Sequence, residues 1–253
     1  MVCRLPKPIP GPGRSVSDTS DKPRWFRSLS VGAAFLVAAL IASRATSSWI
    51  ASAFPNRPLP PDLLFEILPH IPKAGYFTDF AVTAALVLLL VYAFRGNERE
   101  IPAMMALIGL MYLMRAFINV LTPMASPLNH GTYYGMSVPL EHAFRSALAP
   151  VVAPLRSYGI GVSSGVMHLS QNGEFPSGHM GVVFLCMLLV DKAKAPRIKA
   201  AMVVLVVVEC VSLLISHQHY SIDIVGGILL SYFIYYEYTE GTLLNWLKPL
   251  VTV

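Results

Sequence analysis

The sequence predicts an all-α, polytopic membrane protein folded as a six-transmembrane-helix bundle. Composition, the lengths of the apolar segments and the distribution of basic residues all favour this fold class. Of the 253 residues, 55% are apolar and 13% are charged, and soluble domains of this size seldom carry so few charges. The net charge of +5 is scattered over the chain without interleaved aromatic residues, so we expect no nucleic-acid partner.

Helix length defines the spans. A helix needs about 20 mostly apolar residues to cross the hydrocarbon layer, because it rises about 1.5 Å per residue and its backbone groups must be paired in lipid. Six segments reach or approach this length, namely Leu29–Trp49, Tyr76–Phe94, Ile101–Leu121, Pro176–Val190, Ala200–Ser216 and Ser221–Tyr238. The fourth is the shortest, so its amino end is expected below the bilayer surface or in a cavity within the bundle.

Lysine and arginine are unevenly distributed over the loops. Thirteen of the nineteen lie in the two tails and in the second and fourth loops, whereas the opposite loops hold four and Arg44 and Arg115 lie within helices. Cytoplasmic loops carry an excess of Lys and Arg. Both termini are therefore predicted to be cytoplasmic.

The same reasoning divides the chain into three parts. Residues 1–27 are rich in proline and lack apolar periodicity, which predicts a disordered cytoplasmic tail. Residues 28–240 form the six-helix membrane domain, and residues 241–253 form a short cytoplasmic tail. Within the long third loop, the apolar stretch 143–155 is interrupted by prolines. We therefore expect an interfacial or re-entrant helix there, and no seventh span.

Two polar clusters precede the fourth and sixth apolar segments. The first is Gly173–His179, and the second is Ser216–Asp223. The predicted topology places both at the extracytoplasmic face, although about forty residues separate them. Helix amino termini offer unpaired N–H groups and the positive end of the helix dipole, which suit a phosphate.

These clusters contain the side chains needed for phosphoryl transfer. On a helix, Asp223 would lie one turn from His219 and could hold one of its ring nitrogens, leaving the other to attack phosphorus. His179 could then protonate the departing alkoxide and later accept a proton from the acceptor. The candidate catalytic residues are His179, His219 and Asp223.

Simpler interpretations exist for the same residues. A single histidine at a helix end is more often interfacial, and an aspartate is favoured there by the dipole. A metal site of His217, His219 and Asp223 is conceivable. The outer loops lack a carboxylate cluster, however, and a histidine nucleophile needs no metal, so we expect neither a metal nor another cofactor. His217 itself is expected to face solvent or to lie in a loop.

Arg115 lies inside the third apolar segment, where an unpaired guanidinium costs at least about 2.5 kcal/mol. It either clamps a phosphate oxygen or snorkels outward or pairs with a carboxylate such as Glu174 or Glu141. Residues of the two clusters complete the candidate substrate-binding set, which is Arg115, Ser177, Gly178, Glu174 and Tyr220.

The motif residues resemble a known family. Pro176-Ser177-Gly178-His179, followed forty residues later by His219 and then Asp223, resembles two signature motifs of the type 2 phosphatidic acid phosphatase superfamily. His219-Tyr220-Ser221-Ile222-Asp223-Ile224 is similar to the His-Tyr-Thr-x-Asp-Val motif of its sphingomyelin synthase branch. Arg57–Asp62 and Tyr112–Arg115 resemble that branch's first-loop and third-helix motifs.

Two positions distinguish the branches. Leu213 stands where the phosphatases carry an arginine, which favours the synthase-like branch, whereas Pro176 is typical of the phosphatases. The resemblance implies His219 as nucleophile, Asp223 as its orienting partner and His179 as acid and base, without a cofactor. It also implies a membrane phospholipid as donor and a lipid alcohol or water as acceptor. The oligomeric state is not predicted.

Two other functions fit the bundle. A non-catalytic lipid-binding or scrambling protein would keep the helices without needing the histidines. A transporter is less compatible, because the polar residues gather at the outer helix ends and not near the midplane.

Overall fold

The computed structural model describes residues 22–53, 60–124 and 175–251, and all regular secondary structure in these ranges is helical. The long helices are α1 (Lys22–Ala53), α3 (Gly75–Ala93), α4 (Ile101–Leu121), α8 (Pro196–Ile215) and α9 (Ser221–Thr239). Helix α7 (Gly178–Leu189) is shorter. The remaining elements are single turns or little more, namely α2 (Leu63–Ile67), η1 (Pro72–Ala74), η2 (Glu98–Glu100) and α10 (Lys248–Val251).

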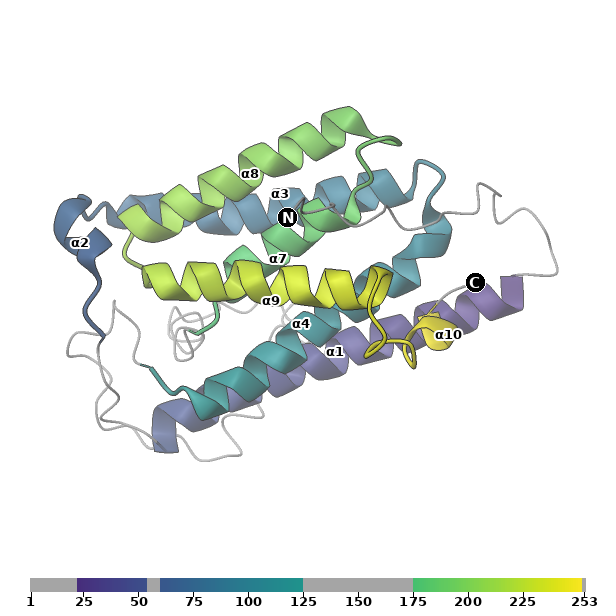
Figure 1. The fold of residues 1–253 in the computed structure, drawn as a ribbon, viewed down its shortest axis with the longest axis horizontal. Coiled ribbons are helices and arrows are strands. Elements are labelled where there is room, and N and C mark those ends of the chain that lie inside the picture. Colours follow the sequence, from purple (N-terminus) through teal and green to yellow (C-terminus); the bar gives the residue numbers. More distant parts are fainter. Residues whose placement is uncertain (1–21, 54–59, 125–174, 252–253) are drawn as a thin grey trace, which may run out of the picture.

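Helix α7 lies inside the bundle and contacts α3, α4, α8 and α9 (Figure 1). Helices α3 and α8 pack together along one side of it, whereas α1 and α4 lie side by side along the other (Figure 1). The central core contains Leu107 and Met111 of α4, Leu185 of α7 and Ile234 of α9, all fully buried. Helix α7, the shortest of the six main helices, is thus enclosed by four of the others.

The directions of the helices bring several of their ends together. Helices α1 and α4 run in parallel, since Gly32 lies against Pro102 near their starts and Ser43 contacts Arg115 towards their ends. The start of α3 meets the end of α8 through a hydrogen bond from the Ile71 N–H to the Ile215 carbonyl. We call the end where α3, α7 and α9 begin the site end.

The opposite end carries most of the described basic residues, and we call it the basic end. Trp25 Nε1 donates to the Glu98 carbonyl at 3.1 Å, and Lys194 Nζ lies 2.9 Å from Glu100 Oε1. These contacts join the start of α1, the turn before α4 and the turn before α8. The described basic residues of this end are Lys22, Arg24, Arg27, Arg95, Arg99, Lys192, Lys194, Arg197, Lys199 and Lys248.

Among the described residues, four helices are long and apolar enough to cross a membrane, over Lys22–Ser47, Pro72–Ala93, Glu98–Leu121 and Pro196–Ile215. The six spans of the sequence-based prediction are therefore not confirmed. Helix α7 has 12 residues, where the prediction had Pro176–Val190, and spans only about 18 Å. Helix α9 has 19 residues but includes Asp223, Glu237 and several tyrosines, which lower its hydropathy.

The outward faces of the long helices carry large apolar side chains, among them Val87 and Leu90 of α3 and Val204 and Val207 of α8. Such surfaces are costly in water but match the hydrocarbon of a bilayer.

Both ends of the described chain are more structured than the sequence suggests. Helix α1 begins at Lys22, so Lys22–Arg27 is helical although it was assigned to the tail; Pro23 is tolerated there because the first turn needs no N–H donor. At the other end, α10 packs against α1 and α4, and Val251 is fully buried. Residues 1–21 and the stretch 143–155 lie outside the described residues.

The contact between α1 and α4 depends on small residues. A Cβ atom added at Gly32 would lie 2.6 Å from the Pro102 carbonyl oxygen, so the helix backbones approach more closely than a side chain allows. We expect Gly32→Val to lower the stability of the bundle by about 1–3 kcal/mol through overpacking. The thermal unfolding midpoint in detergent measures the effect.

Ala38→Val is the matched control, because Ala38 lies on the exposed face of the same helix. Equal midpoints for the two variants would show that the α1–α4 contact is not as close as described.

Candidate active site

Two hydrogen bonds from backbone N–H groups hold the start of α7 in place. Ser177 is the N-cap residue, and its Oγ accepts a hydrogen bond from the Met180 N–H at 3.3 Å. Its own N–H donates to the Asp223 carbonyl at 2.9 Å. The Ser177 hydroxyl therefore serves as a helix cap, and the loop that carries the predicted motif is joined directly to α9.

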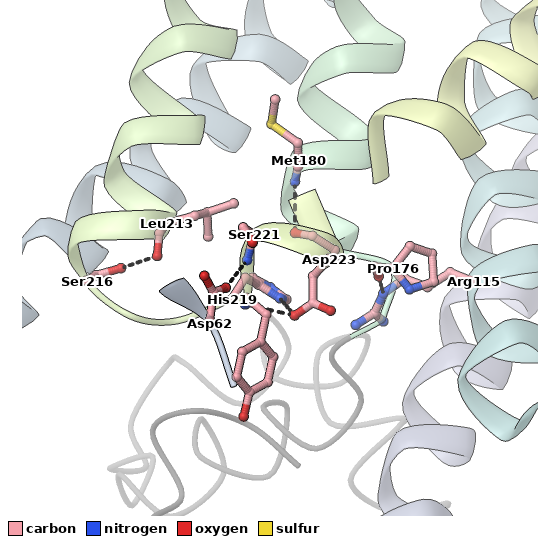
Figure 2. Close-up of polar contacts among 11 residues, drawn as sticks. Asp62, Arg115, Pro176, Met180, Leu213, Ser216, His219, Ser221 and Asp223 are labelled. Carbon is pink, nitrogen blue, oxygen red and sulfur yellow. Dashed lines mark hydrogen bonds and ion pairs between the residues drawn. The ribbon is translucent and has the colours of Figure 1, made fainter. Parts of the chain in front are cut away.

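His219 and Asp223 form the predicted pair. His219 Nδ1 lies 3.4 Å from Asp223 Oδ2, and the residues are 5% and 0% exposed (Figure 2). The same Oδ2 accepts the Tyr220 N–H at 3.0 Å. The pair was expected on a helix, but His219 precedes α9 and its N-cap residue, Tyr220. Asp223 thus caps the helix and holds the imidazole with the same oxygen, leaving Nε2 of His219 on the far side of the ring.

His179 comes from the first turn of α7 and faces the same pair. Its ring centroid lies 6.0 Å from that of His219, with the ring planes 62° apart. The His179 side chain is 43% exposed, in contrast to the buried His219. The two histidines therefore lie in one site, with His219 buried in it and His179 nearer its surface.

Arg115 holds the motif loop from the side of α4. Its Nε donates to the Pro176 carbonyl at 2.8 Å (Figure 2), and its NH1 lies 3.3 Å from Ser43 Oγ. Gly178 packs directly against it, since a Cβ there would lie 3.1 Å from Arg115 Nε. Glu174 and Glu141, the carboxylates considered as partners, lie outside the described residues.

The site is recessed from the ends of α1 and α4. Pro176 lies at the level of Arg115, and α4 continues for six residues beyond Arg115 to Leu121. At about 1.5 Å per residue this extension is about 9 Å long. On this side, the histidines therefore lie roughly one and a half helix turns inside the bundle.

Asp62 anchors the start of α9 from the other side. Its Oδ1 accepts the Leu64 N–H at 3.0 Å as the N-cap of α2, and its Oδ2 accepts the Ser221 N–H (Figure 2). Asp62 closes the first-loop motif, of which 57–59 lie outside the described residues. Tyr220 is 3% exposed, and its ring lies 5.6 Å from that of Phe65. Asp62 and Phe65 thus connect the first-loop motif and α2 to the segment that carries His219 and Asp223.

Three polar residues near the site were missed in the sequence. Asp79 Oδ1 lies 3.7 Å from His179 Nε2, and Gln218 Oε1 accepts from Thr78 Oγ1 at 3.2 Å. Glu209 is fully buried in α8 and interacts electrostatically with His219 and Asp79. The sequence did contain a signal for Asp79 and Glu209, because ionisable residues inside apolar segments are usually functional.

Within the described residues, no group of three or more His, Cys, Asp or Glu side chains is arranged to hold a metal ion. His217, His219 and Asp223, the alternative metal site, do not form such a group.

The sequence profile described as PAP2 superfamily matches residues 70–236, about two thirds of the chain. The chain belongs to the PAP2 superfamily. Members of this superfamily are phosphatases and phosphotransferases that act on phosphoesters. The matched region of this PAP2 protein contains His179, His219, Asp223 and Arg115, whereas α1 precedes it. A search of curated proteins finds no match.

The PAP2 site depends on a close approach between α7 and α9. A Cβ at Gly227 would lie 2.7 Å from the Ser177 carbonyl oxygen, and Ser231 Oγ donates to the Gly181 carbonyl at 2.7 Å. We expect Gly227→Ala to displace the Ser177–His179 segment and to lower turnover of a phosphoester substrate at least about tenfold, because small misplacements of reacting groups are costly. Activity assays and unfolding midpoints, measured together, test this.

Val225→Ala, at an exposed position of the same helix, is the control and should leave turnover unchanged. Full activity of Gly227→Ala would contradict the close contact.

His217 lies in the turn between α8 and α9 with φ 52°, where it was expected in a loop or facing solvent. It is a loop residue, but its ring stacks on Phe65 at 4.3 Å and on His70 at 4.6 Å between centroids. Burial, with a contribution from neighbouring His70, lowers the pKa of His217. The stack therefore favours the neutral ring.

This lowering of the pKa predicts a dependence of stability on pH. The unfolded chain binds a proton at His217 more readily than the folded chain does. The stabilisation that the neutral His217 ring gives the folded protein is therefore present above the unfolded pKa of about 6.5, and it is lost as the pH falls through the pKa of His217 in the folded protein. We expect the unfolding midpoint to drop between about pH 7 and about pH 5, and to drop less in His217→Asn. Asparagine tolerates the positive φ. Identical pH profiles for the two proteins would disprove this role.

Proposed function

We propose that this PAP2 protein is a membrane lipid head-group phosphotransferase, similar to the sphingomyelin synthases, that acts through a phosphohistidine intermediate. The observation that carries the proposal is the buried His219–Asp223 pair with His179 facing it at 6.0 Å between ring centroids. A histidine nucleophile needs an orienting partner on one nitrogen and an acid near the leaving group. The three residues provide both.

The reaction has two matched halves. Nε2 of His219 attacks the phosphorus of the donor phospholipid, and the bond from phosphorus to the lipid oxygen breaks. His179 gives that oxygen a proton. In the second half, the acceptor hydroxyl attacks the phosphohistidine, its proton passes to His179, and the phosphorus–nitrogen bond breaks. Asp223 holds Nδ1 of His219 throughout and favours the charged ring.

Charge on the phosphoryl oxygens would be stabilised by the surrounding groups. The starts of α7 and α9 direct their positive dipole ends towards the site, and the Arg115 guanidinium lies against Gly178. We assign Arg115, Ser177 and Gly178 to substrate binding on this basis. Ser177 and Gly178 contribute through the backbone, because the Ser177 hydroxyl caps α7. Glu174 and Tyr220 remain predicted members of the binding set.

The depth of the site supports a lipid acceptor. His219 is 5% exposed, and Arg115, which holds the motif loop, lies about one and a half turns inside the end of α4, where a membrane-embedded alcohol such as ceramide or diacylglycerol has access. Exclusion of water from such a site favours transfer over hydrolysis. The second candidate is a lipid phosphate phosphatase, which is favoured by the 43% exposure of His179 and by the phosphatase-like Pro176.

We further propose that the site end faces the extracytoplasmic side and that both termini are cytoplasmic. The basic end collects ten of the described lysines and arginines, and cytoplasmic segments are enriched in these residues. In this orientation six helices would span the bilayer, with α7 shielded from lipid by its neighbours.

A transfer assay tests the function. The purified protein is placed in lipid nanodiscs with a phospholipid labelled in its head group, with and without ceramide or diacylglycerol. We expect label on the acceptor lipid, an acid-labile label on the protein, and loss of both by at least about 10³-fold in His219→Ala, since the nucleophile is removed.

His70→Ala is the matched control, because His70 lies at the same end but contacts His217 and not the catalytic pair. Water-soluble label regardless of acceptor would identify the phosphatase instead. No turnover with phospholipid, lysophospholipid or phosphatidate donors would favour a lipid-binding or scrambling protein.

A further inference from the structure

Asp79 is a carboxylate that the proposed reaction does not yet use. It lies near the start of α3, with its side chain 79% exposed and its Oδ1 3.7 Å from Nε2 of His179. Helix α3 carries neither histidine, yet it brings this acid to the outer one. His179 therefore has a carboxylate partner, as His219 has Asp223.

The position of Asp79 relative to the site is fixed by its neighbours on α3. Thr78 is buried, and its Oγ1 contacts Gln218 Oε1 at 3.2 Å. Gly75 packs against the same glutamine, because a Cβ there would clash with Gln218 Nε2. Since Gln218 directly precedes His219, α3 is held against the segment that carries the nucleophile.

The charges around His179 show what Asp79 contributes. Desolvation is the main influence against a positive charge on the His179 ring, and His219 and Arg115 also oppose it, whereas Asp79 from α3 favours it. Even when His179 is protonated, a contact as exposed as this adds little to folding stability, typically about 0–1 kcal/mol. Its influence on the protonation and orientation of a catalytic histidine can be much larger.

We propose that Asp79 is the positioning residue of His179, so that the site contains two His–Asp pairs with different tasks. The Asp79 carboxylate, 3.7 Å from Nε2 of His179, attracts the Nε2–H and favours the tautomer that carries it, which leaves Nδ1 to exchange a proton with the lipid oxygen. In the first half-reaction that proton moves from Nδ1 to the leaving oxygen as the phosphorus–oxygen bond breaks. In the second half it returns from the acceptor hydroxyl, and Asp79 itself gains no proton. This inference rests on the proposed function.

The experiment compares Asp79→Asn and Asp79→Glu with the wild type in the head-group transfer assay, over a range of pH. We expect kcat of Asp79→Asn to fall about tenfold or more with little change in KM, and the limb of the pH–rate profile that reports His179 to move to lower pH. Asp79→Glu should regain part of the rate. Glu66→Gln, which removes an exposed carboxylate of α2, should behave as wild type.

Several results would overturn the proposal. Wild-type kcat and pH profile in Asp79→Asn would show that the pair has no role, and a raised KM at unchanged kcat would assign Asp79 to binding of the head group. A lower unfolding midpoint with an unmoved pH profile in both variants would make it structural. These outcomes require a wild type that turns over substrate and a His219→Ala variant that does not. If the proposed function itself is wrong, the wild type is inactive in the same assay, so the two failures can be distinguished.

Discussion

The hydrogen bond from the Ser177 N–H to the Asp223 carbonyl joins the starts of α7 and α9, and the geometry of the site depends on it. His179 lies two residues after the donor, and His219 lies four residues before the acceptor. The bond can form because Gly227 lets the Ser177 carbonyl approach the α9 backbone. A contact between backbones is insensitive to side-chain rotamers, so it fixes two catalytic candidates from distant segments more firmly than a side-chain contact would.

The buried carboxylate of Asp223 must be compensated in this position. Removing an ionised carboxylate from water is costly unless hydrogen bonds and an opposite charge replace the solvent. Asp223 Oδ2 receives the Tyr220 N–H, which is one of the donors left unpaired at a helix start, and also lies against His219 Nδ1. The helix cap therefore offsets part of the cost of burying the Asp223 carboxylate, and the same oxygen atom both caps α9 and holds the His219 ring.

Apolar segments with sharp polar boundaries were predicted well. Ile101–Leu121 is α4 as observed, and Tyr76–Phe94 differs from α3 by one residue at each end. The start of α1 was placed seven residues late, because Pro23 resembles a helix breaker in sequence while Trp25 gains its partner Glu98 only in the folded chain. The His219–Asp223 pair was found from its spacing, although the predicted helical geometry was wrong, since the imidazole precedes the helix.

Contacts between distant helices could not be predicted in this way. The sequence left a phosphate oxygen, a carboxylate and an outward-snorkelling position open for Arg115; the structure adds the Pro176 carbonyl as an acceptor, and a backbone acceptor leaves no mark in a sequence. Asp79 lies 100 residues before His179, and only the packing of α3 against α7 brings them together. Residues whose roles follow from local spacing were thus visible in the sequence, whereas residues whose roles follow from helix packing were not.

The unequal exposure of the two histidines indicates from which side lipids reach the site. His219 is nearly enclosed, whereas His179 is 43% exposed and lies beside the exposed Asp79. In the proposed reaction, the leaving oxygen and the entering oxygen both exchange a proton with the same group, because the second half reverses the first. In this reaction, donor and acceptor must therefore reach the site in turn from the side of His179. An exposed acid–base residue beside an enclosed nucleophile meets that requirement, since the phosphoryl group can remain on His219 while one lipid is exchanged for the next.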